Sequence, residues 1–362
     1  MIADEQGLAD LIERLAPFPQ IAIDTEADSL HSYFEKLCLV QISTENENYL
    51  VDPLAGFSLQ PLYDALAGKR LVFHGADYDL RLLNRGADFP AKDLFDTMIA
   101  SRLCGSQELG LAALVAKYFN VTLSKASQKA NWGMRPLSKQ MVEYAMCDTK
   151  YLLPLAAIIE ADVRRLGRWE WFVESRDRLL VSAREPRERD ESKAWRITGS
   201  AALSPQAQSV LRVLWFWRDG EARAWDRPPF HVMGNEDLVR ISERTVRGEA
   251  YSTPRMSGRR RRSFEVVLAL ALHIPENEWP VLPKVRRKRA TPEQTKRFDD
   301  LKSVRDRAAA ELGLDPSIIA PRNALEAASL DPTTPSLMNW QKTLLGLEVT
   351  EFAATPCPTP LT

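Results

Sequence analysis

The segment Ile21-Ala22-Ile23-Asp24-Thr25-Glu26 sets the fold expected for the first half of this 362-residue chain. Its apolar run predicts a buried strand over 20–24. Residues i and i+2 of a strand point to the same face, so Asp24 and Glu26 can both reach one point beside the sheet. The segment therefore predicts a sheet whose first strand ends in a pair of convergent carboxylates.

Further along the chain, Tyr144 and Asp148 lie four residues apart in a stretch of helical character and therefore share one helix face. A fourth carboxylate, Asp79, follows another apolar run at 71–75. Four gathered carboxylates repel one another and cannot all stay ionised unless cations neutralise them. Oxygen-only ligands favour Mg²⁺ or Mn²⁺ over zinc.

These residues form three motifs in a fixed order, which together are far more specific than any one alone. The motifs are Asp24-Thr25-Glu26, Phe73-His74-Gly75-Ala76-Asp77-Tyr78-Asp79 and Tyr144-Ala145-Met146-Cys147-Asp148. The set resembles the DEDD superfamily of 3′→5′ exonucleases, in the subclass with tyrosine in its third motif, and within it the ribonuclease D family. In the second motif the resemblance favours Asp79 and leaves Asp77 as a surface carboxylate or helix cap.

The resemblance implies hydrolysis of the 3′-terminal phosphodiester with two divalent ions, Mg²⁺ or Mn²⁺. One ion is expected on Asp24, Glu26 and Asp148, and the second on Asp24 with Asp79. Tyr144 would orient the attacking water. Leu30 matches a position at which proofreading domains wedge an apolar side chain against the terminal bases; a loop-anchoring leucine is the alternative.

The stretch Asn131-Trp132-Gly133-Met134-Arg135-Pro136-Leu137 resembles a signature of the same family in its Asn form. Arg135 can either hold a nucleic-acid phosphate bidentately or pair with a carboxylate that fixes the loop. Ser138 is expected to cap the next helix.

The pattern of the first 180 residues predicts an α/β layered exonuclease domain over 1–180. Strands are expected at 20–24, 36–44, 48–52 and 71–75, with a turn at Asn46-Glu47, and helices at 79–85, 94–104, 109–119 and 138–165. The resemblance implies a ribonuclease H-like fold with a mixed sheet.

A charged linker is expected over 181–200, and the chain beyond it repeats with an offset of 87 residues. Ser204-Pro205 recurs as Thr291-Pro292, each a helix start with a hydroxyl cap and proline. We expect two all-α modules, at 201–283 and 291–350, which resemble the HRDC domain, and a disordered tail at 351–362. The expected core stripes are Val210, Leu214 and Trp217 in one copy and Phe298, Leu301 and Ala308 in the other, and Trp215 and Trp225 are also assigned to core packing.

Charge is unevenly distributed along the chain. Residues 1–180 carry 19 basic and 25 acidic side chains, whereas residues 181–290 carry 22 and 14. The densest runs are Arg259, Arg260, Arg261 and Arg262, and the segment 284–289. Such runs neutralise a nucleic-acid backbone, or else they decorate solvated helix faces and a linker.

Other features narrow the class of protein. No stretch of 18 apolar residues indicates a membrane span, and the first strand lies too close to Met1 for a signal peptide. The four cysteines and four histidines show no paired spacing, which indicates reduced thiols in a cytoplasmic protein without a membrane partner.

The resulting expectation is a 3′→5′ exoribonuclease whose partner is RNA; by resemblance, transfer-RNA precursors with a free 3′ end. A DNA 3′→5′ exonuclease remains an alternative because the same site serves proofreading domains. A catalytically inactive RNA-binding scaffold is the other alternative, and the intact motif residues argue against it.

Overall fold

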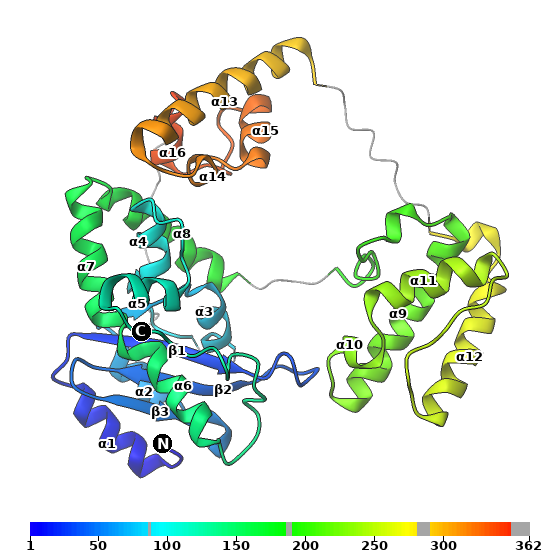
Figure 1. Ribbon diagram of the computed structural model, residues 1–362, viewed down its shortest axis with the longest axis horizontal. Helices are drawn as coiled ribbons and strands as arrows, with labels where there is room; N and C mark the ends of the chain where they lie inside the picture. The colour runs from blue at the N-terminus through cyan, green and yellow to red at the C-terminus, as the bar shows by residue number, and fades with distance from the viewer. Residues whose placement is uncertain (86–87, 186–189, 281–289, 349–362) are drawn as a thin grey trace, which may run out of the picture.

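The computed structural model describes residues 1–85, 88–185, 190–280 and 290–348. The basic segment 284–289 and the tail expected at 351–362 lie outside these ranges. The chain forms an N-terminal α/β domain and two helical modules (Figure 1). In the described parts of the chain, no helix is long and apolar enough to cross a membrane.

The α/β domain is built on one mixed sheet with strand order β3-β2-β1-β4-β5. Strands β1, β2 and β3 pair antiparallel, whereas β4 and β5 extend the sheet in parallel from β1. The expected mixed sheet is therefore confirmed. Its elements in chain order are α1 (Glu5–Leu15), β1 (Gln20–Ala27), β2 (Leu37–Ser43), β3 (Asn48–Val51), η1 (Pro53–Ala55), α2 (Gln60–Leu66), β4 (Arg70–Phe73), α3 (Asp77–Leu83), β5 (Asp93–Asp96), α4 (Thr97–Leu103), α5 (Leu111–Phe119), α6 (Lys139–Lys150), α7 (Leu152–Arg165) and α8 (Trp169–Arg184).

Helices cover both faces of the sheet. Apolar residues of α1, α2 and α3 share one buried cluster with the sheet. Helices α6 and α7 lie on the opposite face, where α6 contacts β1, β2 and β3. This second face is the one on which the acidic residues of β1 and α6 meet.

Two expected helices differ from the structure. The helix expected at 94–104 is wrong in its first residues, because 93–96 form β5 and α4 begins only at Thr97. Short apolar runs do not distinguish strand from helix, and Asp96 ends the strand while its carboxylate caps α4. The helix expected at 138–165 is two helices that meet at Tyr151, since Pro154 cannot continue a helix from α6.

The two helical modules repeat one another at the expected offset. The first contains η2 (Ser200–Ala202), α9 (Pro205–Trp225), α10 (Pro229–Val232), α11 (Asn235–Val246), α12 (Gly258–Leu272) and η3 (Glu276–Glu278), and the second α13 (Pro292–Leu312), α14 (Pro316–Ile319), α15 (Arg322–Leu330) and α16 (Asn339–Leu344). Ser204 caps α9, and Thr291 forms a capping box with Gln294 on α13. Even the helix ends correspond, because Asp226 and Gly313 are both left-handed residues 87 positions apart.

The module cores correct two expectations. Val210, Leu214 and Trp215 are buried as expected, but Trp225 is 48% exposed and lies outside the core. The guanidinium of Arg260 lies 4.5 Å from the centre of its ring. Two parts of the linker expected at 181–200 belong to the folded units: residues 181–184 lie in α8, and Trp195 is buried in the module core.

The second module packs directly on the α/β domain, and the two share one buried apolar cluster. Trp340 of α16 stacks on Trp171 of α8 with ring centres 4.9 Å apart. The Glu174 carboxylate accepts the backbone N–H groups of Asn339 and Trp340. Arg168, which is buried, donates to the backbone oxygen of Leu312 at 2.6 Å.

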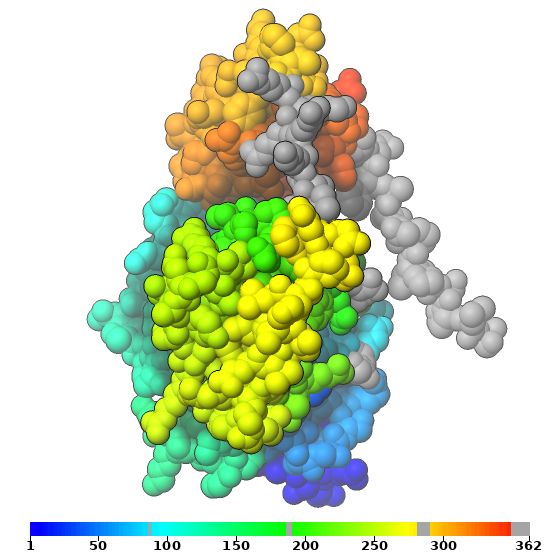
Figure 2. Space-filling view, turned by 90° about the vertical axis from the view of Figure 1, so that its right-hand side faces the viewer, coloured from blue at the N-terminus to red at the C-terminus, as the bar shows by residue number. Residues whose placement is uncertain are grey.

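The first module lies beside the α/β domain (Figures 1 and 2). It contacts the domain through the β1–β2 connection. Hydrogen bonds join Tyr33 and Phe34 of this connection to Asp226 at the end of α9. In the second module the equivalent position, Gly313, also faces the α/β domain: a Cβ atom on Gly105 would lie 2.5 Å from its carbonyl oxygen. Both modules thus turn the C-terminal end of their first helix toward the α/β domain.

Candidate active site

Strand β1 and helix α6 place three carboxylates around one point. Asp24 and Glu26 project from the same face of β1, which α6 covers. Asp148, near the end of α6, completes a group in which one oxygen of each carboxylate lies within 4.8 Å of the others. The Ser138 hydroxyl caps α6 as expected, accepting from the Met141 N–H at 3.2 Å. Among the described residues this is the one group of three or more His, Cys, Asp or Glu side chains that close together.

Tyr144 lies one helical turn before Asp148 on the same face of α6, and the negative charge of Asp148 contributes to the raised pKa of the tyrosine. Its ring packs against the buried Trp132, with ring centres 6.0 Å apart. The tyrosine thus packs on Trp132 beside the acidic group.

The fourth carboxylate, Asp79, is adjacent to this group but not part of it. It lies in the first turn of α3, is buried, and accepts a hydrogen bond of 2.5 Å from the Thr25 hydroxyl. Its negative charge still raises the pKa of Asp24 and of Glu26. Asp77 does not cap α3; it forms an ion pair with Arg81 one turn away.

Burial and mutual repulsion disfavour ionisation of the whole group. Burial, followed by the charges of Asp79, Asp148 and Glu26, raises the pKa of Asp24 well above its usual value. Burial and the neighbouring carboxylates raise the pKa of Glu26 to about 9. Burial raises the pKa of Asp148 to about 7 and that of Asp79 to about 6. The pKa of Tyr144 is also raised, first by burial and then by Asp148, so its hydroxyl stays protonated at neutral pH.

This donor set fits a hard divalent cation. All the convergent atoms are carboxylate or phenol oxygens, which suit Mg²⁺, Ca²⁺ or Mn²⁺. A cation would remove the repulsion that keeps these carboxylates protonated. Cysteine and histidine do not enter the group, as their spacing in the sequence indicated.

Gln41 is a residue of this region that sequence reasoning missed. It pairs with Asp24 across β1 and β2, and cross-strand partners project from the same face of a sheet. Its side chain is fully buried, yet neither its amide oxygen nor its amide nitrogen has a hydrogen-bond partner within the described protein. A buried amide without partners is costly, which indicates that Gln41 is kept polar for the site and not for the fold.

We therefore expect Gln41→Leu to stabilise the metal-free chain by about 1 kcal/mol, because the substitution removes an unsatisfied buried polar group, and to impair catalysis. The measurement is thermal unfolding in EDTA beside the cleavage rate in Mg²⁺. Gln208→Leu is the matched control, since Gln208 is also buried but donates to the Leu203 carbonyl at 3.0 Å. That variant should be destabilised. A destabilised Gln41→Leu protein would contradict the assignment.

Arg135 takes one of the two roles that the sequence left open. Its guanidinium donates to both carboxylate oxygens of Asp52, each at 2.6 Å, and to the backbone oxygens of Cys38, Trp132 and Met134. All five N–H groups are thereby used. Of the two roles left open, the structure shows the loop-fixing pair, in which every N–H group of Arg135 already has a protein partner.

The other residues expected to contact nucleic acid are Leu30 and the four arginines at 259–262. Leu30 is 44% exposed in the loop after β1, so it is not a core leucine. Arg259 and Arg260 form ion pairs with Glu221, at 2.6 and 3.1 Å. Arg261 and Arg262 are exposed on the first turns of α12.

Comparison with known proteins agrees with this geometry. The family model described as 3′-5′ exonuclease matches residues 1–164, and the HRDC domain model matches residues 207–250. Ribonuclease D of Sphingobium indicum is 31% identical over 252 residues, which span 68% of this chain and 64% of that protein. Ribonuclease D of Pseudomonas paraeruginosa is 28% identical over an alignment of 376 positions, which covers 95% of each chain.

Among solved structures, Escherichia coli RNase D, described as an exoribonuclease involved in structured RNA processing, matches with a TM-score of 0.69 and 25% identity over 96% of both chains. The match therefore includes the α/β domain and both helical modules. From the two domain models, in this order, and the relatives that share the whole architecture, the chain belongs to the ribonuclease D family of 3′→5′ exoribonucleases.

Proposed function

We propose that this chain hydrolyses the last phosphodiester at the 3′ end of single-stranded RNA, with two Mg²⁺ or Mn²⁺ ions, and releases 5′-mononucleotides. The observation that carries the proposal is the convergence of Asp24, Glu26 and Asp148 beside the Tyr144 hydroxyl. Asp24, Glu26 and Asp148 would hold one ion, and Asp24 with Asp79 the other. When bound, the ions would lower the pKa of a water nucleophile and neutralise charge on the attacking and leaving oxygens.

The residues of the chain contribute position and charge. Tyr144 is a hydrogen-bond donor at neutral pH because burial and Asp148 raise its pKa; it would orient the attacking water and would not act as a base. Thr25 holds Asp79 through its hydroxyl. Leu30, exposed in the loop that follows β1, is proposed to contact the terminal bases.

We further propose that the substrates are transfer-RNA precursors with a free 3′ end and that the protein acts in the cytoplasm. The proposal is supported by the relatives, which are ribonucleases D, and by the excess of basic side chains in residues 181–290. Arg261 and Arg262 are the members of the arginine run most available to phosphates, because Arg259 and Arg260 already pair with Glu221.

We expect the purified chain with Mg²⁺ to shorten a 3′-tailed transfer RNA one nucleotide at a time, and a terminal 3′-phosphate to slow this at least about 100-fold. A 3′-phosphate adds between −1.5 and −2 charges next to a group of carboxylates, and it occupies the end around which the site is built. Mass spectrometry of the products is the measurement.

A matched DNA oligonucleotide serves as the comparison substrate. Faster digestion of DNA than of RNA would favour the proofreading type of exonuclease, and cleavage of a circular RNA would contradict an exonuclease altogether.

A further inference from the structure

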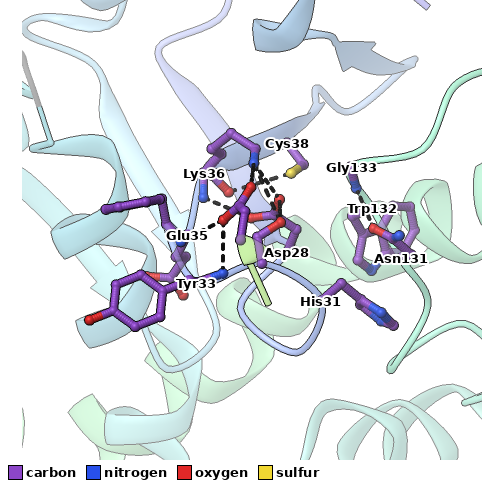
Figure 3. A network of polar contacts seen from close by, with 12 residues as sticks. Asp28, His31, Tyr33, Glu35, Lys36, Cys38, Asn131, Trp132 and Gly133 are labelled. Carbon is purple, nitrogen blue, oxygen red and sulfur yellow. Dashed lines mark hydrogen bonds and ion pairs between the residues drawn. The ribbon is translucent and has the colours of Figure 1, made fainter. Parts of the chain in front are cut away.

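The loop after β1, residues 28–36, is held in place by an unusual number of contacts, and we call it the clasp loop (Figure 3). Asp28, which is buried, organises it from within: its carboxylate accepts from the Ser32 hydroxyl at 2.7 Å and the Lys36 N–H at 2.8 Å. The Lys36 ammonium lies 3.0 Å from the same carboxylate. Since the loop begins two residues after Glu26, its shape affects the end of the strand that carries the site.

The first helical module forms four hydrogen bonds with one side of the clasp loop. The Asp226 carboxylate accepts the backbone N–H groups of Tyr33 and Phe34, at 3.0 and 3.1 Å. The Tyr33 hydroxyl donates to Asp219 of α9 at 2.8 Å. Arg227 donates to the His31 carbonyl at 2.7 Å. These contacts join positions nearly 200 residues apart, and three of the four bonds reach the loop backbone.

The other side of the clasp loop contacts elements of the catalytic domain. Glu35 accepts from the Tyr78 hydroxyl and pairs with Arg85. Tyr78 precedes Asp79 in α3, so this contact reaches the helix that carries the fourth carboxylate. The His31 imidazole meets the Lys129 carbonyl at 3.1 Å, beside the loop that contains Trp132. The clasp loop therefore touches the first module, α3 and the 129–133 segment at once.

The Asp226 carboxylate contacts the clasp loop and is not needed for the fold of the module. It ends α9 in the left-handed conformation, with φ of 48°, where glycine is the least strained residue. The equivalent residue of the second module is glycine, Gly313. The helix end therefore does not need the carboxylate, whose acceptor oxygen goes to the clasp loop.

We infer that the first helical module positions the catalytic site through the clasp loop, with Tyr33 and Asp226 as positioning residues. This role is distinct from RNA binding by the module, and it rests on the proposed function. A free loop would let Leu30, Glu26 and α3 shift against one another. Catalysis depends on such placement at the ångström level, so the module should influence turnover even of a substrate that gains nothing from binding to it.

The test compares Asp226→Gly, which keeps the helix end and removes the acceptor, with Asp226→Asn, whose amide oxygen can still accept both N–H groups. The substrate is a trinucleotide RNA at saturating concentration, beside a 20-nucleotide RNA. We expect Asp226→Gly to lower kcat for the trinucleotide about 3- to 10-fold with little change in KM, and Asp226→Asn to restore it to within about twofold. Tyr33→Phe, which loses one bond, should fall between them. The control is Glu243→Ala in α11, which removes an exposed ion pair with Arg247 and should leave both constants unchanged.

A structural readout separates this inference from the proposed function. Hydrogen exchange of the segment 29–36 should accelerate at least tenfold in Asp226→Gly and remain slow in Asp226→Asn. An inactive wild-type protein would overturn the proposed function, whereas an active wild type with unchanged trinucleotide kcat in both Asp226→Gly and Tyr33→Phe would overturn the positioning role. A defect confined to the 20-nucleotide RNA would also overturn it, because the module would then act only in binding RNA.

Discussion

Replacing Asp24 or Asp148 with asparagine is expected to lower kcat for RNA by about 10³-fold or more while leaving RNA binding largely intact. Each substitution removes a charge from the convergent group, and the loss of a metal-held charge is worth several kcal/mol in the transition state, at about 1.4 kcal/mol per tenfold. Affinity comes mostly from basic residues elsewhere. Single-turnover rates in saturating Mg²⁺, with binding measured in Ca²⁺ or EDTA, give the two quantities.

Asp77→Asn is the matched control for this experiment. Asp77 lies two residues before Asp79 in the same helix, but its carboxylate pairs with Arg81. The activity of the Asp77→Asn variant should stay within about twofold of wild type. Near-normal rates in either Asp24→Asn or Asp148→Asn would remove the basis for assigning these residues to catalysis.

The same variants should be more stable than wild type without metal. The pKa of Asp148 is about 7 in the folded chain against an ordinary 3.8, so the folded state binds a proton that the unfolded state has released. Stability of the metal-free chain therefore falls as pH rises from about 4 to 7. Asparagine does not ionise, so Asp148→Asn should gain on the order of 4 kcal/mol at pH 8 and little at pH 4. The measurement is the free energy of unfolding in EDTA at both pH values. An equal change in stability at pH 4 and pH 8 would contradict the prediction.

The second large effect is expected at the contact between the second helical module and the α/β domain. Trp340→Ala should cost about 3–5 kcal/mol, as deletion of a large buried side chain does, because Trp340 is 6% exposed and stacks on Trp171. This is a large share of the roughly 5–15 kcal/mol that stabilises a domain. Calorimetry should show a lower Tm for the transition in which the exonuclease domain unfolds. Cleavage activity should also be lost at a lower temperature than in wild type.

Leu330→Ala is the control for this prediction. Leu330 belongs to the same module but is 61% exposed, so its truncation should change stability by no more than about 0.5 kcal/mol. The prediction would be contradicted if Trp340→Ala unfolded the second module alone and left the exonuclease domain at its original Tm. In that case the shared core would not stabilise the exonuclease domain.

The sequence predicted the chemistry of this protein better than its assembly. Asp24 and Glu26 on one strand, and Tyr144 and Asp148 on one helix, follow from local periodicity, and the 87-residue repeat predicted both helical modules. Strand β5 was mistaken for the start of a helix because Leu94 and Phe95 form too short a run to show a period. The structure corrects the sequence interpretation of Trp225 and shows one of the two roles left open for Arg135. Only tertiary contacts decide whether a side chain is covered or which groups accept from its donors.

The sequence pattern could not predict contacts between segments that are far apart in the chain. The repeat shows that the modules are alike but not which surface of each meets the catalytic domain. The docking residues lie outside the repeat, in a part of the chain that the sequence did not distinguish: Trp171 and Glu174 are in α8, and Arg168 directly precedes it. Gln41 lacked a signal of its own, since its importance appears only once β2 is placed beside β1 with Asp24 opposite.

The stacking of Trp171 on Trp340 has a consequence for biosynthesis. The two residues are 169 positions apart in the chain. At translation rates of about 5–20 residues per second, the exonuclease domain emerges roughly ten to thirty seconds before the helix that packs on its α8 surface has been made. During that interval the nascent chain would expose Trp171 and the neighbouring apolar residues to the solvent around the ribosome. We expect this half-made surface, and not the completed enzyme, to be what chaperones bind.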